Sequence, residues 1–203
     1  MALTQINQTL ELREILLSNR PNQLYKISTQ GTVPVLILKS GKVIDESLDI
    51  MLWCFDQKDN QLNYKSQLEY IKIIDDDFKY WLDHYKYHDR FPKYSMEYYR
   101  DKCAEILSQF ENLLEKTPFF NSGNEMQLAD MAIFPLIRQF IHVDRNWFFS
   151  VFQALTKWYQ RIHISPIFIS VMEKYDFWKE GASPLLINFY EIENNEKPFL
   201  KKL

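Results

Sequence analysis

Glycine and cysteine are both scarce in this chain of 203 residues. Its 4 glycines are few for a turn-rich β-sandwich, whose tight turns often need the positive φ angles that glycine adopts easily. Only two cysteines occur, Cys54 and Cys103, which excludes a disulfide framework and a metal site built from paired cysteines. Aromatic residues, by contrast, make up 16% of the chain. Few glycines and many large side chains favour a helical protein.

Long apolar runs and clustered positive charge are also missing. No run approaches the roughly 18 apolar residues that indicate a membrane span, so no membrane association is expected. The net charge is −3 and no basic stripe stands out, which argues against a nucleic-acid partner. Residues 1–8 lack the basic and then apolar layout of a signal peptide, so a cytoplasmic location is expected. The apolar share of 46% and charged share of 25% are those of a globular protein.

The first 55 residues show the pattern of short α/β elements. Residues 10–15 alternate between apolar and polar, which is typical of a half-buried strand. Pro21 can open a short helix. The apolar run 35–38 predicts a central strand, and a tight turn joins it to residues 43–44 in a hairpin. Ser47 then stands where it can cap a helix that continues to about residue 55.

A polar stretch at residues 56–61 reads as a linker, and the pattern beyond it is helical. Apolar residues recur there at spacings of three and four, as on one face of a helix. The tail after Gly181 has no sustained period and is expected to lie across the surface. We therefore predict a small domain at residues 1–58 and a helical domain at residues 64–203. The periodic positions are Leu68, Ile71, Ile74, Phe78 and Leu82, then Ala104, Leu107, Phe110, Leu113 and Leu114, then Met131, Phe134, Ile137 and Ile141.

Pro34 lies directly before the apolar run 35–38. A proline there is usually a device for entering a strand, because no backbone donor is needed at that point. The context, however, is Gly-Thr-Val-Pro-Val-Leu followed by a hairpin and Asp-Glu-Ser, and it resembles the glutathione-binding half of glutathione S-transferases. In that thioredoxin-like family the proline is cis, and the residue before it contacts the cysteinyl part of glutathione through its backbone. The resemblance implies this role for Val33.

Glu46 and Ser47 stand at the predicted start of a helix. Taken alone, Ser47 is explained as an N-cap with acidic neighbours that suit the helix dipole. Free N–H groups at a helix start can also bind a carboxylate. The resemblance implies that Ser47 and the adjacent N–H groups hold the γ-glutamyl carboxylate of glutathione, while Glu46 pairs with its ammonium group.

The resemblance continues through the helical part of the chain. Residues 127–135 look like the buried helix start of the family, where Asp130 bonds back to the chain that enters the helix. Residues 78–91 are similar to a motif in a bacterial branch of the family. On that helix Tyr85 and Tyr87 could line the site of the hydrophobic co-substrate, although an aromatic-rich packing helix explains them as well. The implied fold is an α/β thioredoxin-like N-terminal domain followed by an all-α C-terminal domain.

The remaining candidates for chemistry are histidines and cysteines. His84 and His88 have the spacing of two metal ligands on one helix face, but no third ligand accompanies them, so we predict no metal site. Cys54 falls well inside a predicted helix, away from the N-terminal dipole that would lower its pKa. Cys103 lies within an amphipathic helix. Both cysteines are therefore predicted to be packed thiols.

In the family, a first strand and a first helix carry the catalytic Cys, Ser or Tyr where they meet. Residues 1–8 look like the end of that helix, so the region that would carry the catalytic residue is not in this sequence and that residue stays unassigned. Either Met1 is an internal methionine of a longer chain, or the chain is a degenerate member of the family. The loss of that strand would leave a neighbouring strand short of hydrogen-bond partners.

Two functions of different class follow from the resemblance. The first is an enzyme that transfers glutathione to a small electrophile or reduces a glutathione mixed disulfide, with glutathione as substrate. The second is a non-catalytic glutathione-binding or scaffold protein of the same fold. An unrelated helical regulator would require both spaced motifs to be coincidental. The family usually forms two-fold homodimers, and we expect one here.

Overall fold

The computed structural model describes residues 1–58, 64–121 and 123–194, and the chain forms two compact units. The first unit combines residues 1–62 with residues 166–203, and the second comprises residues 63–165. The sequence-based domains at 1–58 and 64–203 stay a prediction, although residues from 166 onward group with the N-terminal segment in the structure. Part of the predicted linker, residues 59–61, and the last part of the predicted C-terminal domain, residues 195–203, lie outside the described residues. No described helix is long and apolar enough to cross a membrane.

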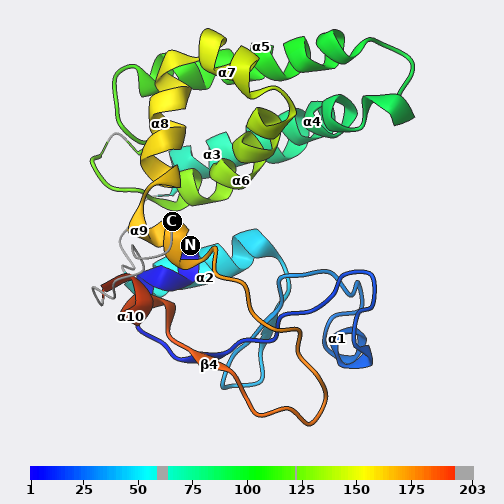
Figure 1. The fold of residues 1–203 in the computed structure, drawn as a ribbon. Helices are drawn as coiled ribbons and strands as arrows, with labels where there is room; N and C mark the ends of the chain where they lie inside the picture. Colours follow the sequence, from blue (N-terminus) through cyan, green and yellow to red (C-terminus); the bar gives the residue numbers. More distant parts are fainter. Residues whose placement is uncertain (59–63, 122, 195–203) are drawn as a thin grey trace. The chain divides into compact units, whose positions relative to one another are not determined.

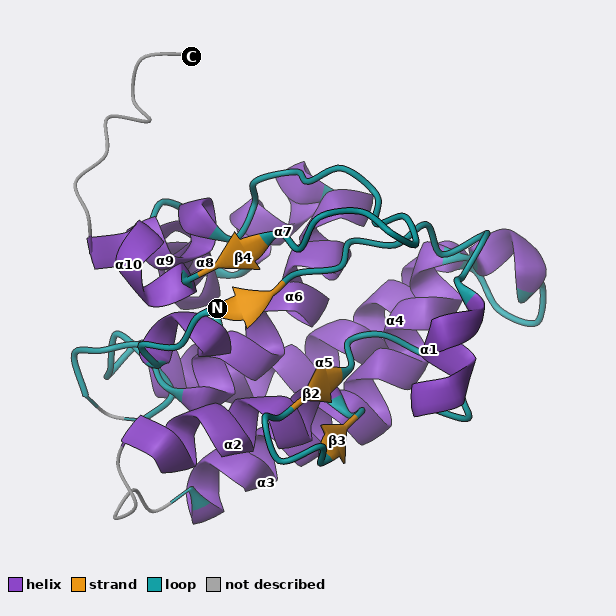
Figure 2. Ribbon diagram, turned by 90° about the horizontal axis from the view of Figure 1, so that it is seen from below, coloured by secondary structure: helices purple, strands orange, loops and turns teal. Residues whose placement is uncertain are grey.

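The first unit contains short elements drawn from both ends of the chain (Figures 1 and 2). Its longest described element is a helix that begins at Ser47. In order they are a 3-10 helix (Ala2–Gln5), β1 (Leu10–Glu11), α1 (Asn22–Ile27), β2 (Leu36–Ile37), β3 (Val43–Ile44), α2 (Ser47–Lys58), α9 (Pro166–Ser170), β4 (Leu186–Ile187) and α10 (Phe189–Asn194).

The predicted hairpin is confirmed, although its strands are shorter than the apolar run suggested. β2 and β3 pair antiparallel, with Leu36 opposite Ile44 and Ile37 opposite Val43. Gly41 has a φ of 84°, a left-handed conformation that glycine adopts without a steric penalty, and it forms the tight turn between the strands. The hairpin leads directly into α2 (Figure 2).

The predicted strand at residues 10–15 forms a ladder only at its beginning. β1 pairs antiparallel with β4, and Leu12 N–H donates to the carbonyl of Leu185 at 2.8 Å. Further along, Trp178 N–H donates to the carbonyl of Glu14 at 2.7 Å. The expected shortage of partners is thus not found at this strand, because the C-terminal tail supplies them. The tail also differs from its predicted surface course, since Ile187 is buried.

The second unit is helical throughout its regular structure (Figure 1). The predicted periodicity is confirmed, because all but three of the predicted positions from Leu68 to Ile141 are buried. The exceptions are Ala104 and Leu113, which are half-buried, while Leu68 is exposed. The elements are α3 (Lys65–Ile73), a π-helical turn (Ile74–Phe78), α4 (Lys79–Lys86), a 3-10 helix (His88–Arg90), α5 (Met96–Leu114), α6 (Leu128–Val143), α7 (Arg145–Val151) and α8 (Gln153–His163).

Aromatic rings fill the centre of this helical unit. Trp158 is fully buried, and its ring lies 5.4 Å from that of Phe120 and 5.9 Å from that of Phe134. The Trp158 indole N–H donates to Asp130 Oδ1 at 2.7 Å. Edge-to-face contacts of this kind add to the free energy gained by burying the rings. The high aromatic content of the sequence thus serves mainly the core.

Candidate functional site

A tight turn at Gly31 lies directly before the Val33–Pro34 segment. Gly31 has a φ of 63°, and its N–H donates to the carbonyl of Ser28 at 3.1 Å. A Cβ atom at Gly31 would lie 2.3 Å from a ring carbon of Tyr25, closer than two carbons can approach. Both the backbone angle and the nearby ring therefore require glycine at this position.

The Val33–Pro34 peptide bond is cis, as predicted. Val33 itself is 44% exposed, so the backbone around it lies at the surface of the first unit. Its role in holding the cysteinyl part of glutathione stays a prediction.

The hairpin brings this exposed backbone toward the start of α2. Val33 precedes β2 and Ser47 follows β3, so the antiparallel pairing of the two strands puts both residues at the same end of the hairpin. A side-chain bond supports the arrangement, because Ser28 Oγ donates to Asp45 Oδ2 at 3.1 Å. Ser28 is 1% exposed and was not predicted as part of the site. The one feature of the sequence that could have indicated Ser28 is its position as a small polar residue just after a short helix.

The first turn of α2 is exposed. Glu46 contributes its backbone carbonyl to the first helical hydrogen bond, accepted from Ile50 N–H at 3.0 Å, so Ser47 is the first helical residue rather than the cap that was predicted. The side chains of Glu46 and Ser47 both face solvent. Across the described parts of the chain, no side chain accepts a hydrogen bond from the N–H groups of residues 47–49. Such N–H groups also lack partners within the helix, so they can bind an anion from outside.

Tyr85 and Tyr87 lie in different surroundings. Tyr85 is 2% exposed, its ring lies 5.2 Å from that of Phe140, and burial raises the pKa of its hydroxyl to about 12. Tyr87 is 38% exposed, with Lys86 Nζ and the Arg90 guanidinium each within 5 Å of its ring centroid. Of these two tyrosines, only Tyr87 thus presents its ring at the surface of the helical unit.

The histidines of the same segment are engaged separately. His84 Nδ1 donates to the Tyr80 carbonyl at 2.8 Å, and the centroid of its ring lies 3.9 Å from that of the Phe91 ring, with the two rings tilted by 31°. His88 instead places Nε2 3.1 Å from Asp89 Oδ1. In residues 1–58, 64–121 and 123–194, no three His, Cys, Asp or Glu side chains are grouped so that they could hold a metal ion.

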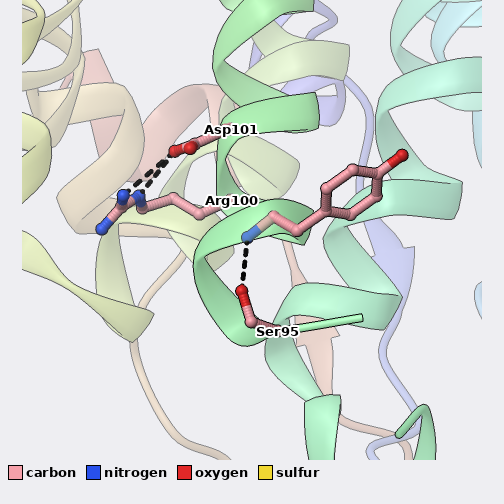
Figure 3. A network of polar contacts seen from close by, with 4 residues as sticks. Ser95, Arg100 and Asp101 are labelled. Atoms are coloured by element: carbon pink, nitrogen blue, oxygen red, sulfur yellow. Dashed lines mark hydrogen bonds and ion pairs between the residues drawn. The ribbon is translucent and has the colours of Figure 1, made fainter. Parts of the chain in front are cut away.

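Aromatic side chains continue into the start of α5. The rings of Tyr94 and Tyr98 are stacked 4.3 Å apart, and both are exposed. Ser95 fixes this end of the helix, because its Oγ accepts the N–H of Tyr98 at 3.2 Å (Figure 3). Arg100 and Asp101, one turn further on, form an ion pair at 3.0 Å (Figure 3). These contacts order the helix and include no group with evident catalytic character.

Both cysteines are packed thiols, as predicted. Cys54 and Cys103 are fully buried, and burial raises the pKa of Cys54 to about 12 and that of Cys103 further. A thiol with a raised pKa carries almost no thiolate at neutral pH, and the thiolate is the nucleophile. Neither cysteine therefore has the properties of a catalytic nucleophile.

Asp130 bonds back to the chain that enters α6, as the resemblance implied. Its Oδ2 accepts the N–H of Gln127 at 3.0 Å, and its Oδ1 accepts that of Phe120 at 3.2 Å. The carboxyl group is fully buried, and desolvation raises its pKa to about 6 despite these hydrogen bonds. Its role is structural.

Two family models match the chain. Residues 1–57 match "Glutathione S-transferase, N-terminal domain", and residues 73–161 match "Glutathione S-transferase, C-terminal domain". None of the curated proteins compared with the chain matches it.

Solved structures with the same fold include three transferases. The glutathione transferase URE2P6 from Phanerochaete chrysosporium, in complex with oxidised glutathione, has a TM-score of 0.64 at 20% identity, covering 74% of this chain and 76% of that chain. BphK, a bacterial GST solved as a ternary complex, has a TM-score of 0.65 at 19% identity, covering 80% and 86%. A sphingomonad glutathione S-transferase complexed with glutathione has a TM-score of 0.66 at 16% identity, covering 84% and 89%. These likenesses confirm the predicted fold, a small α/β N-terminal domain followed by a helical C-terminal domain.

Proposed function

Because the chain belongs to the glutathione S-transferase family, we propose that it binds glutathione at the exposed surface formed by the Val33–Pro34 backbone and the first turn of α2. Val33 bonds the cysteinyl part through its backbone N–H and carbonyl. Ser47 and the N–H groups beside it hold the γ-glutamyl carboxylate. Glu46 pairs with the ammonium group of the same γ-glutamyl residue.

The observation that carries this proposal is the exposed first turn of α2. Its N–H groups meet no side-chain acceptor among the described residues, and Val33 and Ser47 lie at the same end of the β2–β3 hairpin. A carboxylate at a helix start gains charge-assisted hydrogen bonds and the favourable end of the helix dipole. Glu46 would repel a lone anion, but it complements a zwitterion that carries an ammonium group beside its carboxylate.

The proposed reaction is the transfer of glutathione to a small electrophile, or the reduction of a glutathione mixed disulfide. A free thiol has a pKa of about 8.5, so turnover at neutral pH needs a group that favours the thiolate. In the proposed complex, Glu46 and Ser47 hold the γ-glutamyl residue and not the cysteinyl residue that carries the thiol. We assign no described side chain to thiol activation. Tyr87 is the better placed of the two tyrosines for a hydrophobic co-substrate, since Tyr85 is buried.

A calorimetric titration with reduced glutathione tests the binding site. Ser47→Ala should weaken binding about tenfold to a hundredfold, because it removes a hydrogen bond to a charged group worth roughly 1.5–3 kcal/mol. Ser18→Ala is the matched control, since Ser18 is exposed in the same unit and is not among the residues assigned to the site. Equal affinities for the wild type and Ser47→Ala would show that the carboxylate lies elsewhere.

The second candidate, a non-catalytic glutathione-binding or scaffold protein, shares the site and differs only in turnover. The two buried cysteines favour it, because neither can replace a catalytic thiol. Assays with a generic aromatic electrophile and with a glutathione mixed disulfide distinguish the two. Turnover of either compound that Ser47→Ala slows supports the enzyme, whereas glutathione binding without turnover of either supports the scaffold.

We also propose a homodimer in the cytoplasm. Several large apolar side chains of both units are exposed, which is typical of a chain that covers part of its surface by association. Light scattering at micromolar concentration should give twice the mass of one chain. A monomeric mass would contradict the dimer.

A further inference from the structure

A cavity of about 410 Å³ opens in the helical unit between the end of α5 and the first turns of α8. Three basic side chains line it, Lys116 from the turn after α5 and Lys157 and Arg161 from α8. One acidic side chain, Glu115, faces them. The cavity lies wholly within residues 63–165, and nothing in the proposed glutathione site uses it.

The basic residues are arranged to act together. Lys157 and Arg161 are four residues apart on α8, so their side chains lie on the same face of the helix. Arg161 is held in place, because Nη1 donates to the Pro118 carbonyl at 2.8 Å and its guanidinium lies 5.5 Å from the Phe119 ring. Its other N–H groups can still donate to a ligand. None of the ion pairs between described residues involves Lys157, Arg161 or Lys116.

The carboxylate of Glu111, on the neighbouring turn of α5, is already hydrogen-bonded. Glu111 lies on α5, one turn before Glu115, and its carboxylate accepts the N–H groups of Gln153, Ala154 and Leu155 at 2.7–2.8 Å. These bonds direct Glu111 to the start of α8 instead of to the lysines. The lining keeps an excess of positive charge that no described carboxylate neutralises by direct contact.

The rest of the lining is suited to an organic body. Pro118 is half-buried and contributes apolar surface, with the largely buried Leu114 and the fully buried Trp158 behind it. A volume of this size is typical of small-molecule sites, which combine apolar walls with a few placed polar groups.

We propose that this cavity binds a small organic anion with two or more carboxylate or phosphate groups. Arg161 would hold one group bidentately, because the guanidinium fork matches the geometry of either oxyanion. Lys157 and Lys116 would neutralise the remaining charge as point charges. The carbon skeleton would lie against Pro118.

Titration of the labelled full chain with citrate, followed by amide NMR, tests the site. Citrate should shift the amides of residues 114–117 and 154–161 together, with one dissociation constant. Pyrophosphate in a parallel titration distinguishes the two oxyanion sources. Sodium chloride at matched ionic strength controls for screening, since surface charge effects depend on salt.

Two substitutions and one control decide the outcome. Lys157→Gln combined with Arg161→Gln should weaken binding at least about tenfold, since two charged contacts are lost. Lys116→Gln, which leaves α8 unchanged, should weaken it as well, and Lys72→Gln on exposed α3 should not. The proposal would be overturned by amide shifts that spread over all exposed lysines, by equal affinities for every variant, or by a lack of saturation with either anion.

Discussion

The first turns of α8 and α2 begin with the same unpaired backbone donors and are completed in opposite ways. At α8, three N–H groups converge on the carboxylate of Glu111 from the neighbouring helix. At α2, no described side chain accepts the N–H groups of residues 47–49. A helix start filled from within the protein stabilises the fold, whereas an unfilled one is free to bind a ligand.

Three further helices of the second unit resemble α8. Ser95 accepts an N–H at the start of α5, Asp130 does so at α6, and Asp144 Oδ1 accepts the Trp147 N–H at 3.0 Å at α7. From α5 to α8, side chains of the helical unit thus complete the helix starts. Substitutions that change the acceptor at one helix start at a time test this difference from α2.

The largest effect on stability is expected from Glu111→Gln. The substitution replaces a charged acceptor of three hydrogen bonds with a neutral amide that keeps only one oxygen. The free energy of unfolding should fall by about 3 kcal/mol, since bonds to charged groups contribute roughly 1.5–3 kcal/mol each. Urea denaturation measures the change.

Glu105→Gln is the control for that experiment. Glu105 lies on the same helix, and its exposed ion pair with Lys102 should contribute less than about 1 kcal/mol. Equal losses for Glu105→Gln and Glu111→Gln would mean that the bonds to α8 add little.

Asp130 should make stability fall as the pH rises. Burial raises its pKa in the folded state to about 6, above the usual value of the unfolded chain, so the folded state holds the proton more tightly. The stability that Asp130 contributes is then highest below about pH 4, declines through about pH 6 and stays constant above, a loss on the order of 3 kcal/mol.

Comparison with Asp130→Asn isolates that effect from all other carboxyl groups. The unfolding free energy of the wild type minus that of the variant should decrease between about pH 4 and about pH 6. A difference that is constant or increases over this window would show that the three hydrogen bonds outweigh the desolvation.

Ser95→Ala should have a smaller effect. It removes the acceptor for the Tyr98 N–H at an exposed helix start (Figure 3), and such losses cost about 1 kcal/mol. Ser95→Asp restores an acceptor and should recover the stability. A loss of stability in both variants would point to packing instead of capping.

Local patterns predicted most of the helices and the hairpin. The spacing of Ile71, Ile74 and Phe78 reveals a buried helix face, because the helical period recurs within a few residues. The resemblance added the cis bond before Pro34 and the back-bonding of Asp130, neither of which spacing alone can establish.

Contacts between distant segments could not be predicted. β1 pairs with a tail that follows it by more than 170 residues, and Glu111 bonds the start of a helix 42 residues ahead. No local period encodes such pairs, because either partner reads as an ordinary surface residue. The prediction that Tyr85 and Tyr87 line one site could have been avoided in part, since residues two apart on a helix do not lie on the same face.

The most direct test of the open helix start is Ser47→Asp, measured for both stability and glutathione binding. An aspartate in the first turn of α2 can accept the free N–H groups itself, so stability should be unchanged or rise by about 0.5 kcal/mol. The same carboxylate should occupy the place of the γ-glutamyl carboxylate and repel it, so glutathione affinity should fall at least about tenfold. Ser18→Asp, which adds the same charge elsewhere in the unit, should leave the affinity unchanged. Glutathione binding by Ser47→Asp at wild-type affinity would contradict the account.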